Sequence, residues 1–183
     1  MKLESDPKVV KRLAEEREDE NWRFRSFLKG IDLKTEELDA MVHRLYEEAA
    51  GRIDCCACGN CCREVTPVLD DHDILRLATG LGMAKDHIIE RFLVTDKHGD
   101  MIFRNTPCPM FSGNLCTVYD HRPEACRSFP HLHKEDIVFR LIGVVQNCSV
   151  CPIVFNVLER LKAELQHQGD DVREEDEIDE DWI

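Results

Sequence analysis

The chain has 183 residues, of which 43% are hydrophobic and 33% are charged, and its formal net charge is −13. Residues 169–183 hold nine carboxylates against one arginine, which leaves −5 for the rest of the chain. Residues 1–168 therefore lack the basic excess of a nucleic-acid-binding surface. Their longest apolar run, residues 141–145, is far shorter than the roughly 20 residues that span a bilayer.

The first residues are charged and contain no apolar stretch like that of a secretory signal, so we expect a cytoplasmic protein that binds neither nucleic acid nor membrane. Asp6 followed by Pro7 predicts the start of a charged helix that ends near Gly30. A second helix is predicted from Thr35 to Gly51, because its apolar residues recur at the spacing of one buried stripe. These residues are Leu38, Met41, Val42, Leu45 and Ala49.

Beyond a cysteine-rich loop at residues 55–62, apolar periodicity predicts short helices at residues 71–79 and 85–93. We expect strands at residues 101–104 and, from a β-branched and partly alternating pattern, at residues 136–145. Residues 106–130 are rich in proline and glycine and predict a long irregular segment, and Pro152 predicts the start of the last helix.

These elements predict a helix-rich, irregular α+β fold organised around a cysteine-ligated metal centre. We expect a helical N-terminal extension over residues 1–54, a metal-binding domain over residues 55–168 and an acidic disordered tail over residues 169–183.

Ten cysteines in a chain without an export signal indicate metal or redox chemistry rather than disulfides. Five of them lie within residues 55–62. Two-residue gaps allow a turning backbone to direct successive sulfurs at one ion, and Gly59 permits the positive φ that such a turn requires. Cys61 and Cys62 are adjacent, so we expect their side chains to diverge toward two metals or two corners of one cluster.

A second group of cysteines follows at Cys108, Cys116 and Cys126, and Cys148 and Cys151 form a further pair with a two-residue gap. The last pair is equally well explained as small apolar core residues. We take Cys56 as a spare thiol, which leaves nine candidates, enough for two four-ligand sites or for one cluster and a separate ion. The candidate ligands are Cys55, Cys58, Cys61, Cys62, Cys108, Cys116, Cys126, Cys148 and Cys151.

Cationic side chains are expected beside such a centre, because four thiolates around Zn²⁺ or a [4Fe-4S]²⁺ cluster leave a net charge of about −2. Arg63, Arg122 and Arg127 lie close to the cysteines in sequence and are candidates for this role. Nearby histidines, His121, His131 and His133, are expected to be solvated or to lie outside the ligand set.

The chain resembles the YkgJ-like cysteine-cluster family, which is named for its CxxCxxCC signature and described as a zinc- or iron-chelating domain. A similar cysteine motif occurs in flagellin lysine N-methylases, where it is thought to hold an iron–sulfur cluster. The resemblance covers residues 55–151 and implies a metal-chelating domain. It rests on Cys55, Cys58, Cys61 and Cys62, then Cys108-Pro109, Cys116 with Val118-Tyr119, Arg122-Pro123, Cys126-Arg127 and Phe129-Pro130.

Three functions are consistent with these features. The ferredoxin-like CxxCxxC spacing slightly favours a [4Fe-4S] cluster over Zn²⁺ and predicts an iron–sulfur protein. A structural zinc module would instead bind a basic protein partner through its N-terminal helices or its acidic tail. A methyltransferase-related enzyme is disfavoured, because the sequence contains neither a glycine-rich cofactor turn nor a recognisable catalytic residue.

Overall fold

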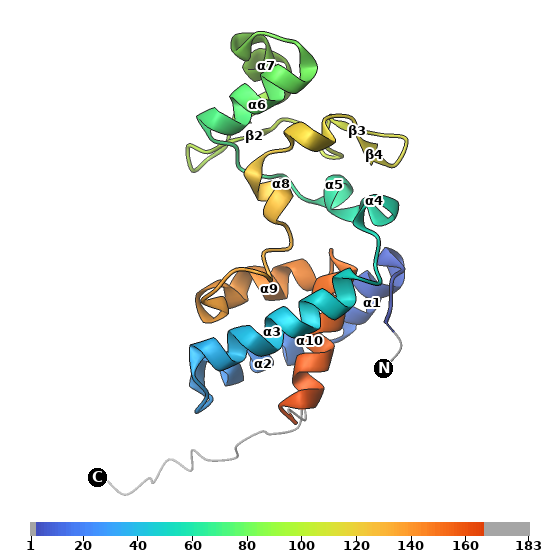
Figure 1. Cartoon of the computed structure of the whole chain (residues 1–183), viewed down its shortest axis with the longest axis vertical. Coiled ribbons are helices and arrows are strands. Elements are labelled where there is room, and N and C mark those ends of the chain that lie inside the picture. Colours follow the sequence, from blue (N-terminus) through green and yellow to red (C-terminus); the bar gives the residue numbers. More distant parts are fainter. Residues whose placement is uncertain (1–2, 167–183) are drawn as a thin grey trace, which may run out of the picture.

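The computed structural model describes residues 3–166, and Figure 1 shows two helical parts joined by a cysteine-bearing segment. The lower part contains α1 (Pro7–Glu16), α2 (Glu18–Gly30), α3 (Thr35–Ala50), α9 (Leu141–Cys148) and α10 (Pro152–Glu164). The upper part contains α6 (Asp71–Leu81), α7 (Lys85–Phe92), β1 (Leu93–Thr95) and β2 (Met101–Phe103). Between them lie α4 (Cys55–Cys58), α5 (Asn60–Glu64), β3 (Phe111–Ser112), β4 (Leu115–Cys116), the 3₁₀ helix η1 (Tyr119–His121) and α8 (Glu124–Ser128). Helices with a few short strands confirm the predicted irregular α+β class.

The lower part has its own apolar core, formed by the inward faces of all five of its helices. The stripe predicted on α3 is buried at Leu38, Val42, Leu45 and Ala49, and it packs with α10. The helix predicted from Pro7 to Gly30 is divided at Arg17, whose backbone leaves the helical region. The break allows Arg17 to pair with Glu159 of α10 and to lie over the Phe155 ring.

The prediction of a strand at residues 136–145 is wrong. This segment forms a 3₁₀ helix, η2 (Ile137–Arg140), followed directly by α9. The buried residues Ile137, Leu141, Val144 and Cys148 recur at helical spacing and face the lower core. Burial against α3 and α10 therefore outweighed the β-branched composition, which is only a weak preference.

Asp39, a residue of α3, holds the backbone at the start of residues 136–145 in place. Its carboxylate is buried and accepts the backbone N–H of Asp136 at 2.6 Å and that of Ile137 at 2.9 Å. Two charge-assisted hydrogen bonds thus satisfy backbone groups that a helix start leaves unpaired.

The upper part has a second, separate apolar core. Leu77 of α6, Ile88 of α7, Leu93 of β1 and Phe103 of β2 are buried in it. Leu93 and Phe103 are partners in the antiparallel pairing of β1 with β2. The strand predicted at residues 101–104 is confirmed as β2, whereas β1 was not predicted.

The predicted domain boundaries at residues 54 and 168 stay predictions. The N-terminal helices α1, α2 and α3 share the lower core with α9 and α10. The acidic tail predicted over residues 169–183 lies outside the described residues.

Within residues 3–166, no single helix is long and apolar enough to cross a membrane. The segments Ile137–Cys148 and Pro152–Glu164 meet that test only as a pair, and they are bent by 119°.

We predict that Asp39→Ala lowers the free energy of unfolding by about 3 kcal/mol, because it removes two charge-assisted bonds and leaves two N–H groups without acceptors. Urea unfolding followed by circular dichroism measures the change. Glu36→Ala is the matched control, since Glu36 is exposed on the same helix. Equal stability of the two variants would contradict this role of Asp39.

Candidate metal centre

Two short helices separated by Gly59 position the five clustered cysteines. The carboxylate of Asp54 caps α4 by accepting the N–H of Cys56 at 2.8 Å. Gly59 then adopts a left-handed conformation with φ of 57°, and α5 begins immediately after it. A Cβ at this position would lie 2.9 Å from the Phe111 ring, so only glycine fits both the turn and the contact.

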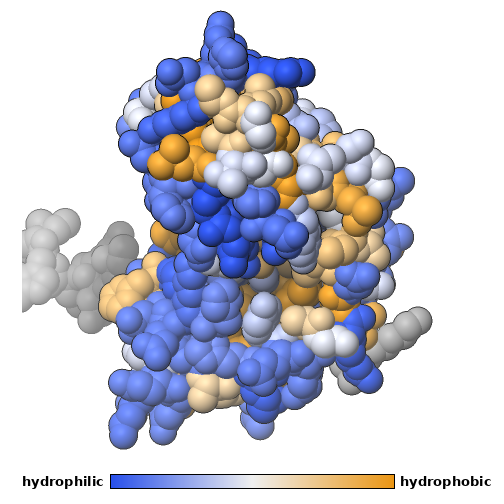
Figure 2. All heavy atoms as spheres, turned by 45° about the horizontal axis from the view of Figure 1, so that its top comes forward, coloured by the Kyte–Doolittle hydropathy of each residue, from blue (hydrophilic) through white to orange (hydrophobic). Residues whose placement is uncertain are grey.

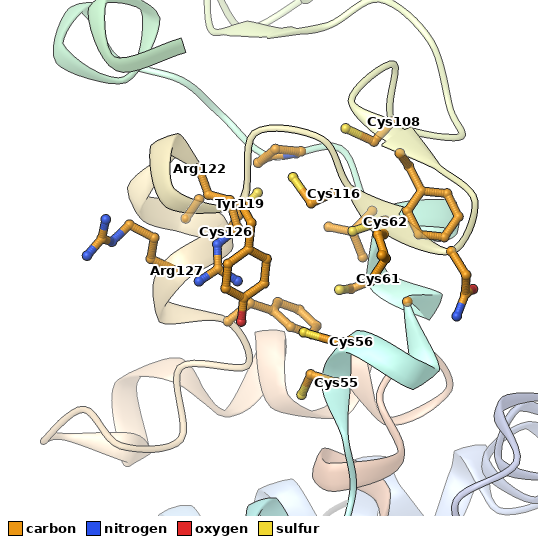
Figure 3. A pocket seen from close by; sticks show the side chains of 18 of the residues that line it. Cys55, Cys56, Cys61, Cys62, Cys108, Cys116, Tyr119, Arg122, Cys126 and Arg127 are labelled. Atoms are coloured by element: carbon orange, nitrogen blue, oxygen red, sulfur yellow. The ribbon is translucent and has the colours of Figure 1, made fainter. Parts of the chain in front are cut away.

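A cavity of about 590 Å³ lies beside α4 and α5. Seven of the ten cysteines line it, and Figure 3 shows their sulfurs around a common space. These are Cys55, Cys56, Cys61, Cys62, Cys108, Cys116 and Cys126. Thiols more than 40 residues apart in sequence are thus brought to one site.

Four of these thiols, Cys62, Cys108, Cys116 and Cys126, form what we call the upper set. Electrostatic repulsion acts between every pair of them. Burial raises the pKa of Cys108 to about 11 and that of Cys126 to about 12, and the neighbouring thiolates add to both increases. Without a cation among them, these buried thiols therefore resist ionisation.

The backbone fixes the upper set from several directions. The N–H of Cys108 donates to the carbonyl of Cys62 at 2.8 Å, and the N–H of Phe111 donates to the carbonyl of Cys108 at 2.9 Å. Phe111 in turn pairs with Cys116 across β3 and β4.

The upper apolar core positions Cys126. Asp73 at the start of α6 is buried, and its carboxylate accepts the N–H of Glu124 at 2.8 Å. Glu124 is the first residue of α8, the short helix that carries Cys126.

A further four thiols, Cys55, Cys58, Cys61 and Cys151, form the lower set. Cys151 is buried at the N-terminus of α10, and burial raises its pKa to about 12. Its sulfur accepts hydrogen bonds from the backbone N–H groups of Val154 and Ile153, and it interacts electrostatically with Cys55, Cys58 and Cys61. Cys58 and Cys151 are not among the residues that line the cavity.

Cys61 and Cys62 lie side by side where the two sets meet. The Cys61 thiol donates a hydrogen bond to the Cys62 sulfur. This hydrogen bond and the positive charges of Arg122 and Arg63 lower the pKa of Cys62 to about 7, although burial acts in the opposite direction. The same hydrogen bond, with burial, raises the pKa of Cys61. Cys62 is therefore the most readily ionised of the thiols with a resolved shift.

The three candidate arginines differ in position. The Arg122 guanidinium lies 3.5 Å from the centre of the Tyr119 ring and lowers the pKa of the Cys62, Cys116 and Cys126 thiols. Arg63 donates to the carbonyl of Cys58 at 2.8 Å and lies over the Phe111 ring. The Arg127 guanidinium points away from the sulfurs (Figure 3), and its Nε lies 3.9 Å from Glu124.

Cys148 does not line the cavity, although its thiol interacts electrostatically with that of Cys151. It is 1% exposed, is buried in the lower core and accepts a hydrogen bond from Asn21 at 3.9 Å. The apolar-core interpretation therefore fits Cys148, whereas Cys151, three residues later, faces the lower set.

Some cavity residues were missed from sequence. Cys56 was taken as a spare thiol, yet it lies in the cavity wall and is hydrogen-bonded to the Tyr119 hydroxyl. Its position at the second residue of α4, rather than its spacing, directs it there. Among the candidate histidines, His131 lines the cavity, while His133 packs on Tyr46 and His121 packs against Gly80.

The model of one protein family, CxxCxxCC, described as "Putative zinc- or iron-chelating domain", matches residues 54–152. The match begins one residue before Cys55 and ends one residue after Cys151, so it includes every cysteine of both sets. No curated protein and no solved structure matches the chain.

We predict that Gly59→Ala lowers both the stability of the protein and its metal content, because the new methyl group requires a strained φ and contacts the Phe111 ring. The expected loss is about 1–2 kcal/mol of unfolding free energy. Urea unfolding and elemental analysis measure the two effects. Gly30→Ala is the control, since a Cβ at Gly30 meets nothing within 4 Å; a Gly59 variant that behaves like it would contradict the prediction.

Proposed function

Because the chain belongs to the CxxCxxCC family of zinc- or iron-chelating domains, we propose that it is an iron–sulfur protein whose cysteines hold [4Fe-4S] chemistry rather than Zn²⁺. The spread of the sulfurs is the observation that carries this proposal. Among residues 3–166, no three thiol sulfurs lie within 4.8 Å of one another. Four thiolates on one Zn²⁺ at about 2.3 Å would bring their sulfurs to about 3.8 Å from one another.

A cluster suits a wider arrangement of sulfurs. In a [4Fe-4S] cluster each thiolate binds a different iron, so the sulfurs surround the cluster instead of meeting at one ion. The cavity of about 590 Å³ between α5, the β3–β4 hairpin and α8 provides the space for such a group.

The environment of the sulfurs also supports an iron–sulfur site. Backbone N–H groups donate to three of the candidate sulfurs: Met110 to Cys108, Val118 to Cys116, and Ile153 with Val154 to Cys151. Hydrogen bonds to sulfur and nearby positive charge set the reduction potential of a cluster. Arg122 and Arg63 supply that charge, and their effect on the Cys62 thiol is in the direction that favours a bound thiolate.

When bound, such a cluster supplies reversible one-electron transfer. The chain itself supplies the thiolate ligands, the N–H donors and a partly apolar wall that includes Phe111 and Phe129. We therefore favour a role in electron transfer or redox sensing.

A protein partner for this role is part of the proposal. The apolar residues of α1 and α2, among them Val10, Phe24 and Leu28, are buried in the lower core. We therefore propose that the charged outer faces of these helices, together with the acidic residues 169–183 of the sequence, contact a basic partner.

We predict that the full chain, purified anaerobically, is brown, absorbs broadly near about 400 nm, and contains iron with acid-labile sulfide. Absorption spectroscopy with iron, zinc and sulfide analysis tests this. Cys148→Ala should keep the absorption, because Cys148 lies in the lower core. A colourless protein with stoichiometric zinc would overturn the iron–sulfur proposal and leave the structural zinc module as the better explanation.

A further inference from the structure

We propose that the cysteines form two separate metal centres, one held by the upper set (Cys62, Cys108, Cys116 and Cys126) and one held by the lower set (Cys55, Cys58, Cys61 and Cys151). The division extends the proposed function, which concerns only the kind of metal, and it assigns each of eight thiols to one centre.

The upper set is complete in itself. Each of its four thiols interacts electrostatically with the other three. The backbone hydrogen bond from Cys108 to Cys62 joins the two segments of chain that carry these thiols. Cys108 and Cys116 pack against the upper apolar core. Four thiolates satisfy one [4Fe-4S] cluster, so this centre needs no ligand from the lower set.

The lower set is assembled against the start of α10. The side chain of Asn60 donates to the carbonyl of Val150 at 2.8 Å, which fixes the loop of Cys58 and Cys61 against the residue before Cys151. Cys151 belongs to the lower apolar core and is 7% exposed. Its sulfur faces two N–H donors and three other thiols, an arrangement that suits a bound thiolate far better than a packed apolar side chain.

The order of the cysteines supports the same division. In two-cluster bacterial ferredoxins, a run of three cysteines at two-residue gaps binds one cluster, and the fourth cysteine of the run, which precedes a proline, binds the other. Here Cys55, Cys58 and Cys61 have those gaps, and Cys62 takes the place of the fourth cysteine, although it follows Cys61 directly and precedes Arg63 instead of proline. Each set also contains one cysteine that precedes proline: Cys108-Pro109 in the upper set and Cys151-Pro152 in the lower.

Cys61 and Cys62 are the boundary between the centres. Cys62 interacts with Cys108, Cys116 and Cys126, whereas Cys61 interacts with Cys151. Cys61 also interacts with Cys126, so the two centres are close neighbours. In Figure 3, Cys62 lies beside Cys116, and Cys61 lies between Cys62 and the Cys55–Cys56 turn.

The test is the metal content and spectrum of the anaerobically reconstituted full chain. For two clusters we expect about eight iron atoms and an equal amount of sulfide per chain. Cys116→Ser should remove only the upper centre and Cys55→Ser only the lower, so each variant keeps half of the iron. Electron paramagnetic resonance of the reduced protein should change from a signal broadened by two interacting clusters to that of one cluster in either variant.

Matched controls and alternative variants keep the test decisive. Cys148→Ala should retain both centres, because Cys148 belongs to neither set, does not line the cavity and is buried in the lower core. If circular dichroism shows that Cys116→Ser has unfolded, Cys126→Ser replaces it as the upper-set variant. Cys58→Ser replaces Cys55→Ser in the same way for the lower set. The stoichiometry of the unmodified chain does not depend on any variant.

The outcomes separate the two proposals. About four iron atoms in the unmodified chain, with complete loss in both ligand variants, would overturn the two-centre inference while the iron–sulfur proposal stands. Two zinc ions per chain, with one lost in each ligand variant, would support two centres and overturn the iron–sulfur proposal.

Discussion

The mutual repulsion of closely placed thiolates is the constraint on which the rest of this structure depends. Burial and neighbouring thiolates raise the pKa of Cys108, Cys126 and Cys151 to between about 11 and 12, so these groups ionise together only if positive charge lies among them. Arg122 and Arg63 contribute part of that charge but number only two against eight thiols. A multivalent metal ion or cluster is the species that satisfies this requirement, because binding it deprotonates its ligands outright.

The segment between the two apolar cores has few regular elements of its own. Residues 106–130 contain only two-residue strands, one 3₁₀ turn and the five-residue helix α8. Such short elements are not stable by themselves, because helix nucleation is costly and two-stranded hairpins are marginal. Metal–thiolate bonds order such a segment in the way that they order small zinc domains. The metal would therefore join the upper core to the lower one as well as provide the chemistry.

Local signals in the sequence predicted the parts of the fold that depend on local physics. Helix starts at Pro7 and Thr35, the helix after Asp70 and the last helix at Pro152 follow from caps, proline and apolar periodicity. The break at Arg17 and the helix at Leu141–Cys148 could not be predicted in this way, because an ion pair with Glu159 decides the first and burial against α2 and α10 decides the second.

The candidate site shows the same difference. Spacing identified the cysteine-rich loop, but it did not separate Cys148 from Cys151, which share one CxxC motif. Their side chains diverge because Cys148 ends a helix that packs inward on Asn21, while Cys151 precedes the first turn of α10 and meets that turn's free N–H groups. Cys56 was taken as a spare thiol, yet its place on α4 brings it to the cavity wall.

In the proposed arrangement, two centres with consecutive residues as ligands would not act independently of each other. Cys61, a ligand of the lower centre, and Cys62, a ligand of the upper centre, are separated by a single peptide unit. A change of one unit of charge at one centre therefore acts on the other, because electrostatic interactions in a partly buried region are screened less than in water. Addition of an electron to one centre therefore makes reduction of the other harder. Arg122 acts on thiols of both proposed centres, Cys62 and Cys55, and Arg63 acts on Cys62 while it donates to the carbonyl of Cys58. The positive charge is therefore shared between the two proposed centres, and the coupling through Cys61 and Cys62 is what would separate their two reduction potentials.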